Sequence, residues 1–407
     1  MSIFLRRWLS ISFLNLLIVA SLGVILRYKI AFFFPYLQQK FILDSHSHFA
    51  FTGWITQTLM VLLVQYLSLK DDQAFKRYRW LLCGNLLAAY GMLISFAIEG
   101  YAFISISFST LSIFVSYFFA LCYWRDLNKM NEMKISHWWF KASLLFSIIS
   151  SIGAFGLAYM MVNKISHQNW YLSAIYFFLH FQYNGWFFFA GTGLLVSKLE
   201  TIETTLRPIK IAFILFSTAC FPAYFLSVLW LPIPSIIFYL IIACVIAQLA
   251  GWLIMVKVFF TTRHYISREF SKYSKLLLLL SGIAFSIKLL LQCGSVHPAL
   301  SQLSYGFRPI IIGYLHLVLL AVTSIFIVGF IVNFYMIPIT KVLITGIYIF
   351  VAGVILNEVL LMIQGIGALS YTSIPGINIL LLIAGLILFT GIGIIFLSRF
   401  RTNAANT

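Results

Sequence analysis

Charged residues are scarce in this sequence. Of its 407 residues, only 9% are Asp, Glu, Lys or Arg, whereas 62% are hydrophobic. A soluble domain has about 25% charged residues, and no soluble core could hide this much apolar surface. The composition therefore excludes an ordinary soluble enzyme. It predicts an all-α protein with many membrane-spanning helices.

Acidic residues and cysteines are also few. Ten Asp and Glu stand against 27 Lys and Arg, which gives a formal net charge of +17. The basic residues fall in short stretches between apolar runs, which is the topology signal of membrane helices rather than a nucleic-acid surface. The five cysteines are scattered with no CxxC spacing, so we expect neither a disulfide framework nor a zinc site.

Twelve apolar runs are long enough to cross a bilayer, which takes about 20 residues. They lie at about 8–26, 48–69, 80–98, 103–123, 139–161, 171–196, 210–230, 235–258, 274–293, 309–332, 341–363 and 376–397. The first run imitates a signal peptide, but it is long for one and no clear cleavage site follows, so we expect it to span. Residues 1–407 are thus predicted to form a single integral membrane domain, a bundle of about twelve helices without a soluble domain.

The basic residues predict the orientation of these helices. With twelve spans, six of the 27 basic residues fall on one side, and these are Arg27, Lys29, Lys40, Lys164, Lys288 and Arg308. All the others fall on the opposite side, which is cytoplasmic by the positive-inside rule. We therefore expect a multi-pass protein of the cell membrane (the inner membrane in a Gram-negative cell) with both termini in the cytoplasm. Membrane lipid is a predicted partner, and nucleic acid is not.

Three predicted helices carry histidines in the outer half of the bilayer. His46 and His48 open the second helix, His180 lies about nine residues into the sixth, and His316 about seven residues into the tenth. A polar side chain at membrane depth is costly and usually faces the interior of the bundle. Neutral imidazole is the usual ligand of haem iron and copper. The pattern indicates a haem or metal site; the alternative is that each histidine hydrogen-bonds to a neighbouring helix.

A six-coordinate haem takes its two axial ligands from two helices, and the predicted set is His316 with one histidine of the pair. Residues two apart on a helix point about 200° apart, so only one of His46 and His48 can face the iron. His48 lies deeper, on the same face as Thr52 and Thr56, and is the expected ligand. His46 is then a supporting partner, a propionate contact or a second ligand position.

These residues resemble two groups of haem proteins. Twelve helices with histidines on the second, sixth and tenth resemble the large subunit of the haem-copper oxidases and nitric oxide reductases. The opening His46-Ser47-His48, followed by Gly53, resembles the NnrS family of twelve-helix membrane proteins, which contain haem and copper and are linked to nitric oxide stress. The resemblance implies a haem protein of respiration or of the nitric oxide response, with a quinone or a cytochrome as electron donor.

The resemblance also implies roles for particular residues. It makes His48 and His316 the ligands of a low-spin haem, and His180 a position for copper or non-haem iron. Tyr183 and Asn184, which follow His180 closely, are then neighbours of that second metal.

The sequence departs from the oxidase pattern at several points. The run at about 210–230 has no histidine, so the pair that completes the oxidase copper site is absent. After His180 come Phe181-Gln182-Tyr183-Asn184-Gly185 in place of Pro-Glu-Val-Tyr. The arginine pair that holds haem propionates is missing, and only Arg308 or Lys40 could substitute. A complete oxygen-reducing centre is therefore not expected.

Two other functions fit the same composition. Twelve helices are also common among transporters, and Glu358 and Lys288 inside predicted helices could serve a proton-coupled carrier. However, the sequence shows no inverted repeat and no pair of Gly/Pro-broken helices. A structural or assembly subunit, in which the histidines only join helices, is the third possibility. The substrate, the haem type and the oligomeric state do not follow from the sequence.

Overall fold

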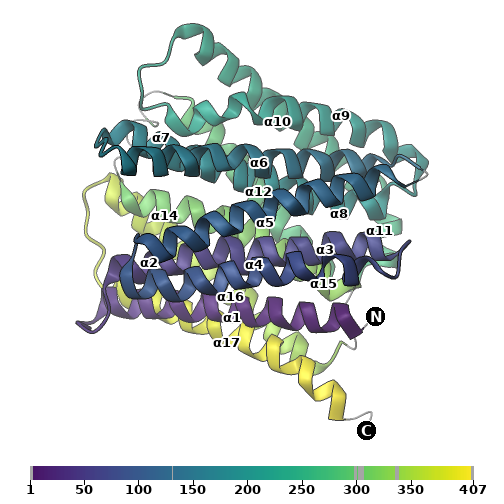
Figure 1. The fold of residues 1–407 in the computed structure, drawn as a ribbon, viewed down its shortest axis with the longest axis horizontal. Coiled ribbons are helices and arrows are strands. Elements are labelled where there is room, and N and C mark those ends of the chain that lie inside the picture. Colours follow the sequence, from purple (N-terminus) through teal and green to yellow (C-terminus); the bar gives the residue numbers. More distant parts are fainter. Residues whose placement is uncertain (1–2, 131, 298–299, 301–306, 335–338, 405–407) are drawn as a thin grey trace. The chain divides into compact units, whose positions relative to one another are not determined.

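The computed structural model describes residues 3–130, 132–297, 300, 307–334 and 339–404. These residues form helices without any strand, which confirms the predicted all-α class (Figure 1). In chain order the helical elements are α1 (Ile3–Ala31), α2 (Gln39–Phe49), η1 (Ala50–Thr56), α3 (Gln57–Ser68), α4 (Ala74–Glu99), α5 (Phe103–Asn128), α6 (Ile135–Val162), α7 (Gln168–His180), η2 (Phe181–Phe187), α8 (Phe188–Leu199), α9 (Glu203–Cys220), η3 (Pro222–Val228), α10 (Ser235–Thr261), α11 (Arg263–Glu269), α12 (Lys272–Ser295), α14 (Arg308–His316), η4 (Leu317–Ser324), α15 (Ile325–Phe334), α16 (Lys341–Leu369) and α17 (Ile377–Ala404).

Ten helical stretches in the described part of the chain are long and apolar enough to cross a membrane. They are Phe4–Ala31, Gln39–Ser68, Ala74–Glu99, Phe103–Asn128, Ile135–Val162, Ser235–Thr261, Lys272–Ser295, Arg308–Phe334, Lys341–Leu369 and Ile377–Ser398. An eleventh is counted if α9 and η3, which are bent by 50° at their junction, form one span. The chain is therefore a multi-pass membrane protein by the length and composition of its helices, and the predicted number of twelve is not confirmed.

The remaining predicted span, 171–196, is helical but is not among these ten. It corresponds to α7, η2 and α8, which follow one another without a break. His180, Gln182 and Asn184 lie near its middle, and these polar side chains lower its mean hydropathy.

Large apolar side chains cover much of the outer surface. Leu87, Ile152 and Leu253 are 61%, 61% and 65% exposed, each in the middle of a long helix. A soluble protein rarely exposes extended apolar patches. These exposed apolar faces are therefore suited to contact with the lipid of a membrane.

The chain divides into two compact units, and each is described by itself. The first unit comprises Met1–Phe119, Leu276–Leu278 and Ser324–Thr407, and the second comprises Ala120–Lys275 and Leu279–Thr323. Packing units inside a helical bundle are not the same as separate domains, so the single membrane domain stays a prediction.

In the first unit α16 lies along α17, and α17 lies along α1 (Figure 1). Glycines permit the close contact of α16 and α17. A Cβ at Gly353 would lie 2.7 Å from the backbone N of Leu388, and one at Gly346 would lie 3.0 Å from the backbone N of Ile395. Main-chain atoms cannot change rotamer as a side chain can. A larger residue at either glycine would therefore force α16 and α17 apart.

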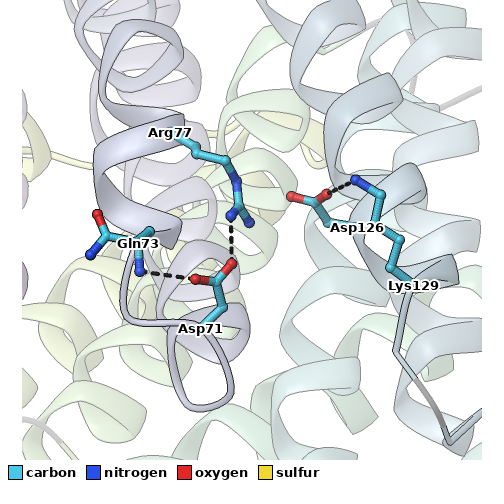
Figure 2. Close-up of polar contacts among 5 residues, drawn as sticks. All are labelled: Asp71, Gln73, Arg77, Asp126 and Lys129. Carbon is cyan, nitrogen blue, oxygen red and sulfur yellow. Dashed lines mark hydrogen bonds and ion pairs between the residues drawn. The ribbon is translucent and has the colours of Figure 1, made fainter.

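The turn between α3 and α4 is held by one carboxylate. Asp71 accepts a hydrogen bond from the backbone N–H of Gln73 at 2.9 Å and pairs with Arg77 Nη1 at 2.5 Å (Figure 2). The Arg77 guanidinium, helped by the Gln73 N–H, lowers the pKa of Asp71 below its ordinary value. A depressed carboxyl pKa favours the folded state above the unfolded pKa, and this contribution is lost as the pH falls.

A second ion pair lies at the C-terminal end of α5, in the second unit. Lys129 Nζ lies 3.3 Å from Asp126 Oδ1, three residues earlier in the chain (Figure 2). The Lys129 side chain is largely exposed, so this ion pair contributes little to stability. Both carboxylates lie in regions that the basic residues predict to be cytoplasmic.

We expect Gly353→Ala to destabilise the protein, because the new methyl group would press on the backbone of Leu388. Overpacking of this kind costs about 1–3 kcal/mol, and it should lower the Tm of the purified protein in detergent. Gly385→Ala on α17 is the matched control, since its Cβ would meet only Val24 Cγ2 at 3.6 Å and alanine favours a helix over glycine. Equal losses of Tm in the two variants would contradict the packing argument.

Candidate functional site

Each of the three helices with predicted site histidines contains a π-helical segment. The segment η1 begins two residues after His48, η2 begins directly after His180, and η4 begins directly after His316. Such segments are rare and frequently occur at functional sites. The three helices therefore share a backbone feature next to their histidines, although the sequence shows no repeat.

Polar side chains of neighbouring helices bind carbonyl groups of these widened turns. In the first unit, Asn15 Nδ2 donates to the carbonyl of Gly53 at 2.6 Å, and the Tyr90 hydroxyl donates to Asn15 Oδ1 at 2.7 Å. In the second unit, Ser281 Oγ donates to the carbonyl of Val322 at 2.8 Å. The hydrocarbon core of a bilayer has no water for this task, so the neighbouring helices supply the donors.

His46 is held by the main chain of α1. Its Nδ1 lies 3.1 Å from the carbonyl oxygen of Val19. A carbonyl oxygen only accepts, so Nδ1 carries the proton, and Nε2 of the neutral ring keeps its lone pair. No hydrogen bond to this Nε2 occurs among the described residues. A ligating histidine usually donates its other ring N–H in this way.

His48 has a different environment, although it lies only two residues further on. Its Nε2 lies 2.8 Å from the Tyr101 hydroxyl, and its ring stacks on Phe96 with the centroids 4.3 Å apart. Tyr101 lies in the turn between α4 and α5, where partial burial and the nearby Asp44 carboxylate raise its pKa to about 12. The phenol therefore keeps its proton at neutral pH and can donate it to Nε2 of His48.

His316 has the same protonation pattern as His46. Its Nδ1 lies 2.8 Å from the carbonyl of Ile312, one turn earlier on α14. The carbonyl requires the proton on Nδ1, so Nε2 carries the lone pair. Arg308, the predicted propionate partner, is exposed at the first turn of the same helix.

His180 is almost completely buried, with both ring nitrogens in hydrogen bonds. Its Nε2 donates to the carbonyl of Cys220 at 2.8 Å, and Nδ1 accepts from Asn184 Nδ2 at 3.1 Å. Cys220 Sγ in turn lies 3.8 Å from the carbonyl of Asn184. The predicted alternative of a hydrogen bond between helices describes these contacts well.

The break between α9 and η3 explains why Cys220 offers a carbonyl. Pro222 has no N–H and interrupts the helix. The N–H of Tyr224, which would bond to Cys220 in a regular α-helix, donates to the carbonyl of Phe221 at 3.2 Å instead. His180 thus donates to the Cys220 carbonyl, which the bend leaves without its helical N–H partner. A proline in an apolar run was the sequence signal for this site.

A metal at His180 does not fit this arrangement, because both nitrogens are already bound within the protein. The predicted copper or non-haem iron position, with Tyr183 and Asn184 as neighbours, would need one of these hydrogen bonds to break. No group of three or more His, Cys, Asp or Glu side chains that could hold a metal ion occurs in the described part of the chain. Axial ligation of a haem needs no such group.

The second unit brings the helix of His180 next to the helix of His316. The rings of Tyr183 and Tyr314 meet edge to face, with their centroids 6.3 Å apart. Lys288 on α12 interacts electrostatically with both His180 and Cys220. Three of the predicted residues, His180, Tyr183 and Asn184, therefore do lie together, within a polar region that also contains a lysine.

Comparisons with known proteins identify no relative. No protein-family model matches the chain, and no curated protein matches it. The resemblance to the haem-copper and NnrS proteins accordingly stays a prediction.

We expect His180→Phe to destabilise the protein, because the change leaves the Cys220 carbonyl without a donor in an apolar surrounding. An unsatisfied buried acceptor costs about 1–3 kcal/mol, which thermal unfolding in detergent would measure. Tyr224→Phe is a milder control, since it removes a single hydrogen bond, to the carbonyl of Ser173 at 3.0 Å. A variant with wild-type stability that has lost a bound metal would instead favour the metal interpretation.

Proposed function

We propose that this chain is a haem-binding, multi-pass membrane protein of respiration or of the nitric oxide response. The supporting observation is the protonation pattern of two histidines. His46 and His316 each donate Nδ1–H to a main-chain carbonyl, each close to a π-helical segment. A histidine that holds a metal usually donates its other ring N–H in this way, which fixes the tautomer, so these two histidines could hold haem iron.

We further propose that the ligands are His316 and His46. The sequence argument prefers His48 because of its depth, but Nε2 of His48 is engaged with the Tyr101 hydroxyl. The pairing of two histidines on one iron rests on the sequence and on the resemblance to haem-copper proteins. In this proposal His48 and Tyr101 support the site, and Arg308 is the basic residue assigned to a propionate.

A haem held by two histidines would supply one-electron redox chemistry. The residues of the chain orient and protect this group: Val19 orients the His46 ring, and Ile312 orients the His316 ring. A quinone or a cytochrome is the proposed electron donor. Copper or non-haem iron at His180 stays a secondary proposal, which the two hydrogen bonds of its ring do not favour.

The ligand assignment predicts a difference between neighbouring histidines. Protein expressed with added haem and then purified should show a six-coordinate low-spin spectrum. His46→Ala and His316→Ala should each lose this spectrum, because each removes one iron ligand, whereas His48→Ala should keep it with a shifted redox potential. His167→Ala changes an exposed histidine before α7 and should have no effect.

Two results would contradict this assignment. If His48→Ala loses the low-spin spectrum and His46→Ala keeps it, the ligand is His48, as the sequence suggests. If the wild-type protein takes up no haem, the whole haem proposal is wrong.

We also propose that the protein lies in the cell membrane and crosses it twelve times. Both termini are then in the cytoplasm. The decisive stretch is Gln168–Leu199, which is helical but more polar than the others. Topology reporters inserted at Lys164 and at Thr201 should report opposite sides of the membrane, with Thr201 on the side of a C-terminal reporter. Reporters on the same side at Lys164 and Thr201 would mean that this stretch does not cross.

Proton-coupled transport is the second candidate, and buried charges are the observation in its favour. Glu358 on α16 accepts a hydrogen bond from Asn357 Nδ2 at 3.2 Å and interacts with Arg27 in the first unit. Lys288 is buried in the second unit. Charged groups at membrane depth commonly mark ion or substrate pathways, so this candidate gains weight if no haem is bound.

A further inference from the structure

Lys288 is a buried lysine without an acidic partner among the described residues. It lies on α12 in the second unit and is only 3% exposed. Among the described residues its ammonium makes no hydrogen bond or ion pair, and its charge lies 5.2 Å from the centre of the Phe285 ring. Burial of an unpaired ammonium costs several kcal/mol, so a missing partner would explain why this residue is tolerated.

Two buried amide side chains also lack partners, one on the helix of Lys288 and one on α10. Gln292, one turn further along α12, is 7% exposed, and Gln248 on α10 is 5% exposed. The side-chain oxygen of each is buried without a hydrogen-bond donor, and the amide nitrogens form no hydrogen bond within the described part of the chain. Orphaned polar atoms are rare in folded proteins and call for an explanation such as an ion or water.

Contacts between α10 and α12 occur on both sides of Gln248 and Lys288 along the two helices. Trp252 Nε1 donates to Ser286 Oγ at 2.8 Å. Two turns of α10 before Trp252, Cys244 belongs to the apolar cluster on which Cys293 packs. Gln248 lies midway between these two contacts on α10, as Lys288 lies between Ser286 and Cys293 on α12.

The other neighbours of Lys288 are neutral. His180 accepts from Asn184 at Nδ1 and donates from Nε2, so its ring carries one proton and no charge. Cys220 offers a carbonyl and a thiol, and its carbonyl is already taken by His180. No described Asp or Glu pairs with Lys288, so the protein itself does not balance this charge.

We propose that Lys288, Gln292 and Gln248 form a binding site for a small, singly charged anion. The ammonium supplies the charge, and the amide N–H groups supply further hydrogen bonds. The two orphaned amide oxygens can each accept an N–H of Lys288 while the amide nitrogens face the anion. The Lys288 ammonium, the two amide oxygens and the two amide nitrogens then each have a hydrogen-bond partner. The site is independent of haem binding, because it uses none of the proposed haem ligands.

Chloride is a suitable probe for the full-length protein in detergent. Chloride replaces gluconate at constant ionic strength, and the width of the chloride NMR line and the Tm are measured together. The wild type should broaden the line saturably and gain stability as chloride rises, because a ligand stabilises the state that binds it. Lys288→Gln should weaken binding at least about tenfold, as expected for loss of a charged hydrogen bond.

Control variants separate binding from folding. Lys272→Gln removes an exposed lysine at the start of the same helix and should leave chloride binding unchanged. Lys288→Arg keeps the charge and should keep binding. Gln292→Leu retains Lys288 and should bind more weakly, which tests the site even if Lys288→Gln fails to fold. The proposal would be overturned if the wild-type protein gave no saturable response to chloride. It would also be overturned if the Gln292→Leu and Lys288→Gln variants both bound chloride as the wild type does.

Discussion

The hydrogen bond from a side chain to a main-chain carbonyl of a neighbouring helix is the interaction on which the polar interior of this protein depends. Asn15 reaches Gly53, His46 reaches Val19, and His180 reaches Cys220. In an apolar surrounding an unpaired polar group is expensive, and hydrocarbon offers no water to replace a lost partner. Each of these bonds therefore joins two helices and, for a histidine, fixes which ring nitrogen carries the proton.

This constraint gives the predicted histidines different roles. The carbonyls bound by His46 and His316 place the ring proton on Nδ1, whereas both ring nitrogens of His180 form hydrogen bonds within the protein. Two of the π-helical segments beside these residues are held by side chains of neighbouring helices, which donate to the carbonyls of Gly53 and Val322. Among the described residues, Lys288 is buried without such a partner, and the side-chain oxygens of Gln248 and Gln292 also lack one.

Much of the fold could be predicted because hydropathy and loop charge are local properties of the chain. The predicted runs overlap the observed helices, but two of them are not among the ten long apolar helices. Pro222 breaks one run at a 50° bend, and the polar centre of Gln168–Leu199 sets the other apart from the ten apolar spans. The candidate residues could be named from sequence, but partners such as Val19, Tyr101 and Cys220 could not, because they lie far away in the chain.

The sequence by itself determined that this is an all-helical membrane protein, and it determined which helices carry the candidate histidines. Only the tertiary structure decided which ring nitrogens are engaged, that Cys220 releases a carbonyl to His180, and that His46 and His48 have different partners. The reason is physical. A helix forms from contacts between residues close in sequence, whereas the proton position in the rings of His46 and His180 depends on an acceptor that another helix brings to each.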